Sequence, residues 1–252
     1  MSTNANDPRR AGRTDRGEGA RQVLEADKRR RRRMIAIQVG VVALVVAAVI
    51  GGTVYALSGS DDNAAVAGSV PAGVNDDGAY LVGNPEAPVT IQVVEDFQCP
   101  VCQQFEAVAG AMLDEYAAGD DVNVEYRGIA FLDRASTTDY SSRALNASAC
   151  VIDSSSAETW KEFHRQLYVE QPPEGGAGLP DSDLVRIAQD AGAGDVELCV
   201  ADRTWDDWVQ ATTAAAFDDG VDGTPTVFVN GEEIADFDPA TIQAAVDEAL
   251  AS

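Results

Sequence analysis

The chain has few histidine and cysteine residues that could bind zinc. Its 252 residues include one histidine, His164, and four cysteines, of which only one pair has the C-x-x-C spacing. A closed structural zinc site needs about four nitrogen or sulfur ligands. The sequence therefore argues against a zinc site, and no metal or cofactor is expected.

Basic residues are scarce after residue 57, where Lys161 is the only lysine. Residues 1–33 hold 11 of the 18 Lys and Arg residues but only 5 of the 42 Asp and Glu residues. The rest of the chain therefore carries 7 basic against 37 acidic residues, which excludes nucleic acid as a partner. This acidity either keeps the protein soluble or reflects adaptation to salty surroundings, and both explanations are open.

The N-terminal part lacks the pattern of a folded domain. Residues 1–33 have no sustained apolar period and are expected to form a disordered cytoplasmic tail. Residues 34–57 have no charge, and these 24 residues are enough to cross a bilayer as a helix. The basic residues before them place the N-terminus in the cytoplasm and the following chain outside the cell membrane. We expect a single-pass anchor; a signal peptide cleaved after Ala56 is the alternative.

The sequence from residue 58 on is predicted to be a linker followed by a folded domain. Residues 58–79 are rich in small and polar residues without a period, which predicts a flexible linker. Apolar patterns at 89–94 and 122–126 predict two strands, and helical spacing from Phe105 to Tyr116 predicts a helix between them. This order makes a β-α-β unit with an at least partly parallel sheet.

The second half of the domain is predicted to be helical before it returns to strands. Residues 144–217 lack strand alternation. Apolar residues at 226–229 predict a third strand, and the Asn-Gly turn after it predicts an antiparallel return at 232–234. Asp238 is a typical N-cap for the helix that is predicted to end the chain.

Two cysteines stand where the first strand gives way to the helix, as Cys99-Pro100-Val101-Cys102. Two intervening residues let the sulfur atoms approach each other across the first helical turn. Unpaired backbone N–H groups and the helix dipole stabilise a thiolate there. The spacing therefore predicts a redox dithiol in which Cys99 is the nucleophile.

The order of elements and three segments resemble the thioredoxin superfamily, and more narrowly its DsbA-like thiol:disulfide oxidoreductases. The segments are Asp96 to Cys102, Gly223 to Gly231, and Trp160 to His164. The expected fold class is α/β, a thioredoxin-like β-α-β … β-β-α fold. The domain is expected at residues 80–252, with a helical insertion at about 138–218, after one transmembrane helix.

The resemblance implies thiol–disulfide exchange through a mixed disulfide that Cys102 resolves. It also implies a cis peptide bond before Pro225, with backbone groups near Thr224 free to pair with an extended substrate peptide. The intervening Pro100 and Val101 lack the histidine of the strongest oxidants of this family. Cys99 is therefore expected to be a less extreme thiolate.

The family often has a buried acid six residues before the first cysteine, where this chain has Val93. Glu95, on the same face of the strand, is a candidate substitute. The alternative is that Glu95 and Asp96 are partly exposed carboxylates at a strand end. The sequence gives no reason to include His164 in the site.

The other two cysteines, Cys150 and Cys199, fall in two predicted helices of the insertion. We expect a structural disulfide between them, which suits an oxidising compartment. A second redox pair and two free buried thiols are the alternatives. A structural disulfide would stabilise the helical layer by about 2–4 kcal/mol.

These features predict a membrane-tethered enzyme that oxidises cysteine pairs in exported proteins. The resemblance implies a membrane quinone-linked reoxidase as partner. The same chemistry in reverse, as a reductase or isomerase, is one alternative. A module that binds Cu(I) through Cys99 and Cys102 and a chaperone with idle thiols are alternatives of other classes.

Overall fold

The structure is a computed structural model, and it describes residues 69–252. The predicted cytoplasmic tail and membrane anchor, and the linker up to residue 68, lie outside the described residues. Within residues 69–252, every helix is too short or too polar to span a bilayer.

The domain is built on a mixed sheet of five strands in the order β1-β3-β2-β4-β5. Strands β2 and β3 run parallel and the other neighbouring strands run antiparallel. The predicted β-α-β unit is therefore confirmed. The strands are β1 (Tyr80–Val82), β2 (Val89–Glu95), β3 (Val122–Gly128), β4 (Thr226–Val229) and β5 (Glu232–Glu233).

Helix α2 (Pro100–Ala117) connects β2 to β3, and helix α8 (Pro239–Ala251) ends the chain. The two helices contact each other, α2 packs against β3, and α8 packs against β2 and β4. Asp238 caps α8 by accepting hydrogen bonds from the backbone N–H groups of Ala240 and Thr241, as its position in the sequence predicts.

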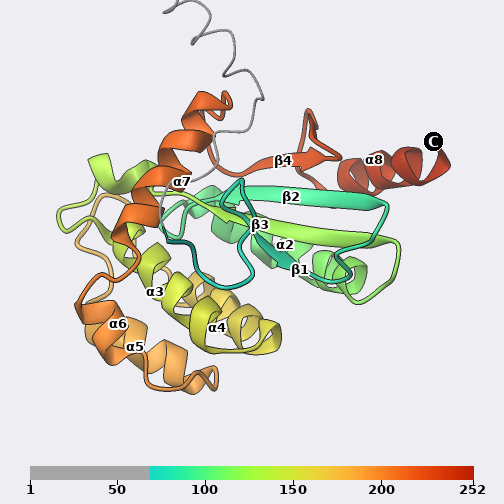
Figure 1. Cartoon of the computed structure of the whole chain (residues 1–252). Coiled ribbons are helices and arrows are strands. Elements are labelled where there is room, and N and C mark those ends of the chain that lie inside the picture. Colours follow the sequence, from blue (N-terminus) through green and yellow to red (C-terminus); the bar gives the residue numbers. More distant parts are fainter. Residues whose placement is uncertain (1–68) are drawn as a thin grey trace, which may run out of the picture. The chain divides into compact units, whose positions relative to one another are not determined.

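The expected helical insertion is present between β3 and β4, and it forms a layer beside the sheet (Figure 1). Helices α3 and α4 contact each other, and α7 returns to pack against β3. A short 3-10 helix, η1 (Phe131–Arg134), leads into this layer. Its helices are α3 (Tyr140–Ser154), α4 (Ala157–Val169), α5 (Asp181–Asp190), α6 (Glu197–Ala201) and α7 (Asp206–Asp218).

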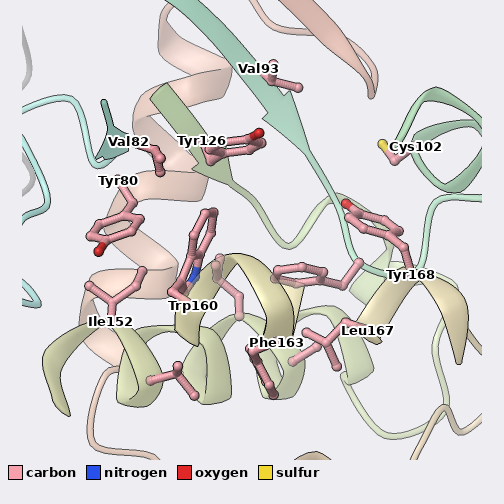
Figure 2. Packing of buried hydrophobic residues seen from close by; sticks show 14 of the residues in the cluster. Tyr80, Val82, Val93, Cys102, Tyr126, Ile152, Trp160, Phe163, Leu167 and Tyr168 are labelled. Carbon is pink, nitrogen blue, oxygen red and sulfur yellow. The ribbon is translucent and has the colours of Figure 1, made fainter. Parts of the chain in front are cut away.

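The sheet and the helical layer share one hydrophobic core. Figure 2 shows Tyr80 and Tyr126 from the sheet beside Trp160 of α4, with ring centroids 4.7 and 5.1 Å from the indole. Buried aromatic pairs at such distances contribute about 0.5–1.5 kcal/mol beyond area burial. The insertion is therefore fixed to the sheet rather than packed as a separate body.

A disulfide joins Cys150 of α3 to Cys199 of α6. Both helices belong to the helical layer, and the bond closes a loop of 49 positions in the sequence. The alternative of two free thiols is therefore wrong for this pair.

The folded domain begins earlier than the sequence predicts. Val74 forms a bridge with Tyr80. The side-chain amide of Asn75 donates to Glu125 of β3 at 2.9 Å, and its carbonyl accepts from the N–H of Ala79 at 2.9 Å. These bonds fix residues that were predicted to be the end of a flexible linker.

Candidate active site

The two thiols lie at the N-terminus of α2, as predicted. Cys99 is the N-cap residue of this helix, and Pro100 is its first residue. The N–H of Cys99 donates to the carbonyl of Asp96 at 2.9 Å, which fixes the turn between β2 and the helix. Both thiols are free; Cys99 keeps 6% of its surface exposed and Cys102 none. Only the first sulfur is therefore within reach of a substrate.

The environment shifts the pKa values of the two thiols in opposite directions. Cys99 has its pKa lowered from 9.0 to about 6, chiefly by a hydrogen bond from Cys102. Burial opposes this shift, while the Thr224 side chain and the N–H groups of Val101 and Cys102 support it. Burial and the nearby Cys99 sulfur raise the pKa of Cys102 well above its usual range. At neutral pH, Cys99 is therefore a thiolate and Cys102 a thiol.

The loop before β4 faces the dithiol. The Thr224–Pro225 peptide bond is cis, as the resemblance implies, and Pro225 is buried. The thiol form of Cys99 donates to the carbonyl of Thr224 at 3.3 Å. Residues separated by 125 positions in the chain are thus brought together at one site.

Asp96 is a central residue of the site, and the expectation that it could be partly exposed is wrong. Its side chain has no exposed surface. It accepts hydrogen bonds from the N–H of Gln98 at 2.7 Å, the hydroxyl of Ser141 at 2.7 Å and the N–H of Leu132 at 2.8 Å. Burial raises its pKa to about 6, and these bonds oppose that shift. Asp96 therefore joins the dithiol turn to η1 and α3.

The loop after α4 also holds the dithiol turn. The side-chain amide of Gln171 donates to the carbonyls of Phe97 and Cys99, at 3.1 and 3.0 Å. The amide of Gln98 donates to the carbonyl of Pro173 at 3.3 Å. The sequence pattern gave no indication of these contacts, because glutamine in a loop carries no periodic signal.

Glu95 is buried, with 2% of its surface exposed, so the expectation of partial exposure is wrong for this residue too. It is hydrogen-bonded to Nε2 of His164, a residue that the sequence gave no reason to include. The second ring nitrogen, Nδ1, lies 4.0 Å from the carboxylate of Glu106 on α2. The position of His164 in one of the three segments that resemble the family was a signal that could have indicated it.

Glu95, Glu106 and His164 are the cluster of possible metal ligands within residues 69–252. Each offers an atom within 4.8 Å of the others. However, Glu95 is hydrogen-bonded to Nε2 and Glu106 lies nearest Nδ1, so the two carboxylates flank the imidazole on opposite sides. The arrangement fits a chain of hydrogen-bonding groups better than a metal site. Neither Cys99 nor Cys102 belongs to this cluster, so within residues 69–252 His164 is not grouped with the thiols as a third ligand for Cu(I).

The thioredoxin family model matches residues 75–248. The chain belongs to this family. Reduced DsbG from Mycobacterium tuberculosis, a disulfide bond oxidoreductase, is 30% identical with a TM-score of 0.62, over 71% of this chain and 90% of that chain. Oxidised DsbA from the same organism is 31% identical with a TM-score of 0.61, over 69% of this chain and 93% of that chain. The described domain is therefore a DsbA-like thiol-disulfide oxidoreductase domain of the thioredoxin superfamily.

Curated relatives contain a similar segment within longer chains. The serine/threonine-protein kinase PknE of M. tuberculosis is 33% identical over 124 residues, which are 48% of this chain and 22% of the kinase. The Na(+)/H(+) antiporter NhaA 3 of Salinispora tropica is 30% identical over 182 residues, 71% of this chain and 26% of the antiporter. The chain thus spans about a quarter or less of the length of these relatives.

Proposed function

We propose that the protein oxidises cysteine pairs in exported proteins through its Cys99–Cys102 disulfide. The observation that carries this proposal is the opposite shift of the two pKa values, which prepares Cys99 as thiolate and keeps Cys102 as a buried thiol. A cysteine with a lowered pKa stabilises the reduced form of such a pair, and therefore makes the pair more oxidising.

In the forward reaction a substrate thiolate attacks the sulfur of Cys99 in the oxidised protein. The Cys99–Cys102 bond breaks, its electron pair goes to the sulfur of Cys102, and this sulfur takes up a proton. A second substrate thiolate then attacks the substrate sulfur of the mixed disulfide. Cys99 leaves as a thiolate, and its lowered pKa makes it a good leaving group. The substrate loses two electrons and the protein gains them.

The substrate peptide is proposed to bind in an extended conformation beside Thr224 and Pro225. The loop that contains both residues lies against the dithiol, where the thiol form of Cys99 donates to the carbonyl of Thr224. Backbone N–H and C=O groups bind an extended peptide largely without regard to its sequence. This suits an enzyme that acts on many exported proteins.

Reoxidation of the dithiol requires an electron acceptor, and a membrane quinone-linked reoxidase is the proposed partner. The apolar, uncharged segment 34–57 supports a membrane anchor with the domain on the outer side. Treatment of intact cells with a protease, which would digest the domain but spare a cytoplasmic marker, tests this orientation.

The reduction potential of the Cys99/Cys102 pair in the full chain tests the direction of the reaction. The protein would be equilibrated with glutathione buffers and the remaining thiols counted by mass spectrometry. A potential near about −120 mV supports an oxidase, and one near about −270 mV indicates a reductase. A protein with no redox-active pair contradicts both functions and points to Cu(I) binding or a chaperone.

A further inference from the structure

A cavity of about 740 Å³ lies between α2 and α4, and its lining includes neither of the two thiols nor the Thr224–Pro225 loop. Several residues of both helices that line it are exposed, such as Gln104 and Arg165, so the cavity is open to solvent. Its lining also includes Glu106 and the buried His164. The cavity therefore gives water access to Glu106, whose side chain is 12% exposed, beside the more deeply buried His164.

These two groups belong to a chain that leads from the cavity to the dithiol. The carboxylate of Glu106 lies 4.0 Å from Nδ1 of His164, and Nε2 of His164 is hydrogen-bonded to Glu95. Glu95 ends β2, four residues before Cys99, which caps the helix that carries the buried Cys102, and its negative charge contributes to the raised pKa of Cys102. The other oxygen of Glu95, Oε2, is buried and has no hydrogen-bond partner among residues 69–252. It is thus available to hold a proton.

The imidazole of His164 is enclosed by aromatic rings that keep bulk water away from it. The centroids of Tyr126 and Trp160 lie 4.9 Å from the centroid of its ring. Those of Tyr168 and Phe97 lie at 5.2 and 5.7 Å. With both nitrogens facing carboxylates and water excluded on the other sides, a proton can leave or reach this ring mainly through Glu95 and Glu106.

Cys102 needs such a connection, because its protonation changes in every catalytic cycle. It is a thiolate when the disulfide breaks and a thiol in the resting reduced form. Its side chain has no exposed surface, so water cannot supply or remove the proton directly. A proton transferred in a buried site requires groups that can each accept and release it.

We infer that Glu95, His164 and Glu106 form a proton relay between the sulfur of Cys102 and the cavity between α2 and α4. The inference rests on the proposed thiol–disulfide exchange. It assigns a role to His164 and Glu106, neither of which touches the substrate.

The relay supplies the proton that the sulfur of Cys102 takes up in the forward reaction. When the Cys99–Cys102 bond breaks, Nε2 of His164 gives a proton to the carboxylate of Glu95, and Glu95 passes a proton on to the thiolate of Cys102. Glu106 returns a proton to His164 through Nδ1 and takes one from water in the cavity. The 4.0 Å gap closes by rotation of the Glu106 carboxylate, whose terminal torsion is broad. Reoxidation of the dithiol runs the same steps in reverse.

The protonation states at neutral pH suit this direction of transfer. Burial disfavours the imidazolium of His164, but the charge and hydrogen bond of Glu95, aided by Glu106 and Asp114, raise its pKa. Burial and the charges of Glu95 and Asp114 raise the pKa of Glu106 to about 8, against the opposing effect of His164. Glu106 is therefore a proton donor at neutral pH, and the contact with Glu95 favours a proton on Nε2 of His164.

Other titratable groups face the relay from the surrounding elements. Asp114 on α2 is paired with Lys161 on α4 at 2.9 Å. Burial raises the pKa values of Tyr126 on β3 and Tyr168 on α4 well above the usual range, so both stay neutral. Asp96, next to Glu95, accepts the three hydrogen bonds described above, and burial raises its pKa to about 6, so it titrates below neutral pH.

The test uses His164→Gln in the full chain. Glutamine can still donate a hydrogen bond to Glu95 but cannot carry a proton near neutral pH. Single-turnover rates of reduction by dithiothreitol and of reoxidation by oxidised glutathione are measured from about pH 5 to 9. General acid–base groups contribute about 10²–10⁴-fold, so we expect both rates to fall at least about tenfold and to lose the wild-type pH profile. Alkylation of Cys99 by iodoacetamide should change less than about twofold.

Chemical rescue separates a proton carrier from a packing residue. In His164→Ala, free imidazole enters through the cavity and should restore the rates in proportion to its concentration. Glu106→Gln, at the wall of the cavity, should slow both rates without disturbing the buried ring. The matched control is Glu162→Gln, which removes a carboxylate from the same cavity lining and should leave the rates unchanged.

Three outcomes overturn the relay. These are wild-type rates and pH profile in His164→Gln, a slow His164→Ala that imidazole does not rescue, and stoichiometric Zn²⁺ binding that controls the wild-type rates. A wild-type protein without a redox-active Cys99/Cys102 pair would instead overturn the proposed function, and the relay with it. If the protein proves to be a reductase instead of an oxidase, the relay still holds. The rates with dithiothreitol and with oxidised glutathione test proton transfer in both directions of the reaction.

Discussion

The side chain of His164 is hydrogen-bonded to that of Glu95, although 69 positions separate the two residues in the chain. One belongs to α4 of the helical layer and the other ends β2 of the thioredoxin sheet. The contact therefore links the insertion to the strand that positions the dithiol. An insertion of this kind adds chemical groups to the active site as well as surface.

Substitution of Cys99 and substitution of Cys102 should each stop turnover, but at different steps of the reaction. Cys99→Ser should lower exchange activity to background, because only Cys99 combines partial exposure with a lowered pKa. Cys102→Ser should accumulate a mixed disulfide, because the resolving sulfur is absent. Mass spectrometry of the protein after incubation with a cysteine peptide checks both results; a covalent adduct on Cys102 in the Cys99→Ser variant would contradict the assignment.

The pH dependence of stability should differ between the reduced and oxidised forms. The pKa of Cys99 is lowered in the folded protein, so its thiolate stabilises the reduced form fully only above the unfolded pKa of about 9. This contribution is lost as the pH falls from about 9 through about 6. As the pH is increased from about 6 to about 9, the melting temperature of the reduced form should therefore rise relative to that of the oxidised form. Calorimetry of both forms at matched pH measures the difference, and the oxidised form is the internal control.

Asp96→Asn should change stability and potential together. The amide group of asparagine cannot accept all three hydrogen bonds that the carboxylate accepts. We expect the free energy of unfolding to fall by about 1–3 kcal/mol. The loss of a negative charge near Cys99 should also make the pair more oxidising. Denaturant unfolding and glutathione equilibration measure the two effects; a more reducing pair would contradict the electrostatic argument.

Removal of the second disulfide should affect stability but not exchange. The double variant Cys150→Ala/Cys199→Ala avoids a stray thiol that could react with Cys99. A bond that closes a loop of this length contributes about 2–5 kcal/mol, so the melting temperature should fall clearly. Single-turnover exchange should stay near the wild-type rate. A well-folded double variant with slow exchange would show instead that Cys150 and Cys199 carry electrons.

Gly110→Ala should separate helix stability from proton transfer. Alanine in place of glycine within α2 should stabilise the helix by up to about 1 kcal/mol. The added Cβ would lie 3.0 Å from Oε2 of Glu106, so this carboxylate must shift. We expect a higher melting temperature together with an altered pH profile of the single-turnover rates. An unchanged profile would show that the position of Glu106 is not critical.

Most of the fold follows from local patterns in the sequence. The alternating and continuous apolar residues at 89–94 correspond to β2, and the helical spacing after the cysteines corresponds to α2. The short edge strand β1 (Tyr80–Val82) was not predicted, because three residues are too few to show a period. These residues are identified as a strand by their antiparallel pairing with β3, and not by a pattern in their own sequence.

The centre of the site was predictable and its surroundings were not. The C-x-x-C spacing indicated Cys99 and Cys102, and the resemblance placed Pro225 beside them. The burial of Glu95 and Asp96 depends on helices α3 and α4, which follow later in the chain and cover the end of β2. A pattern within a few residues cannot show whether a carboxylate at a strand end will be covered by distant helices.

The bond between Cys150 and Cys199 means that the maturation of this protein is itself an oxidation. Cys150 and Cys199 must lose two electrons before a newly synthesised chain reaches its final form. Under the proposed function, an existing molecule can remove them, so each new copy is a client of earlier copies. The supply of finished enzyme then depends on enzyme already made, and recovery after a reducing stress should be self-accelerating.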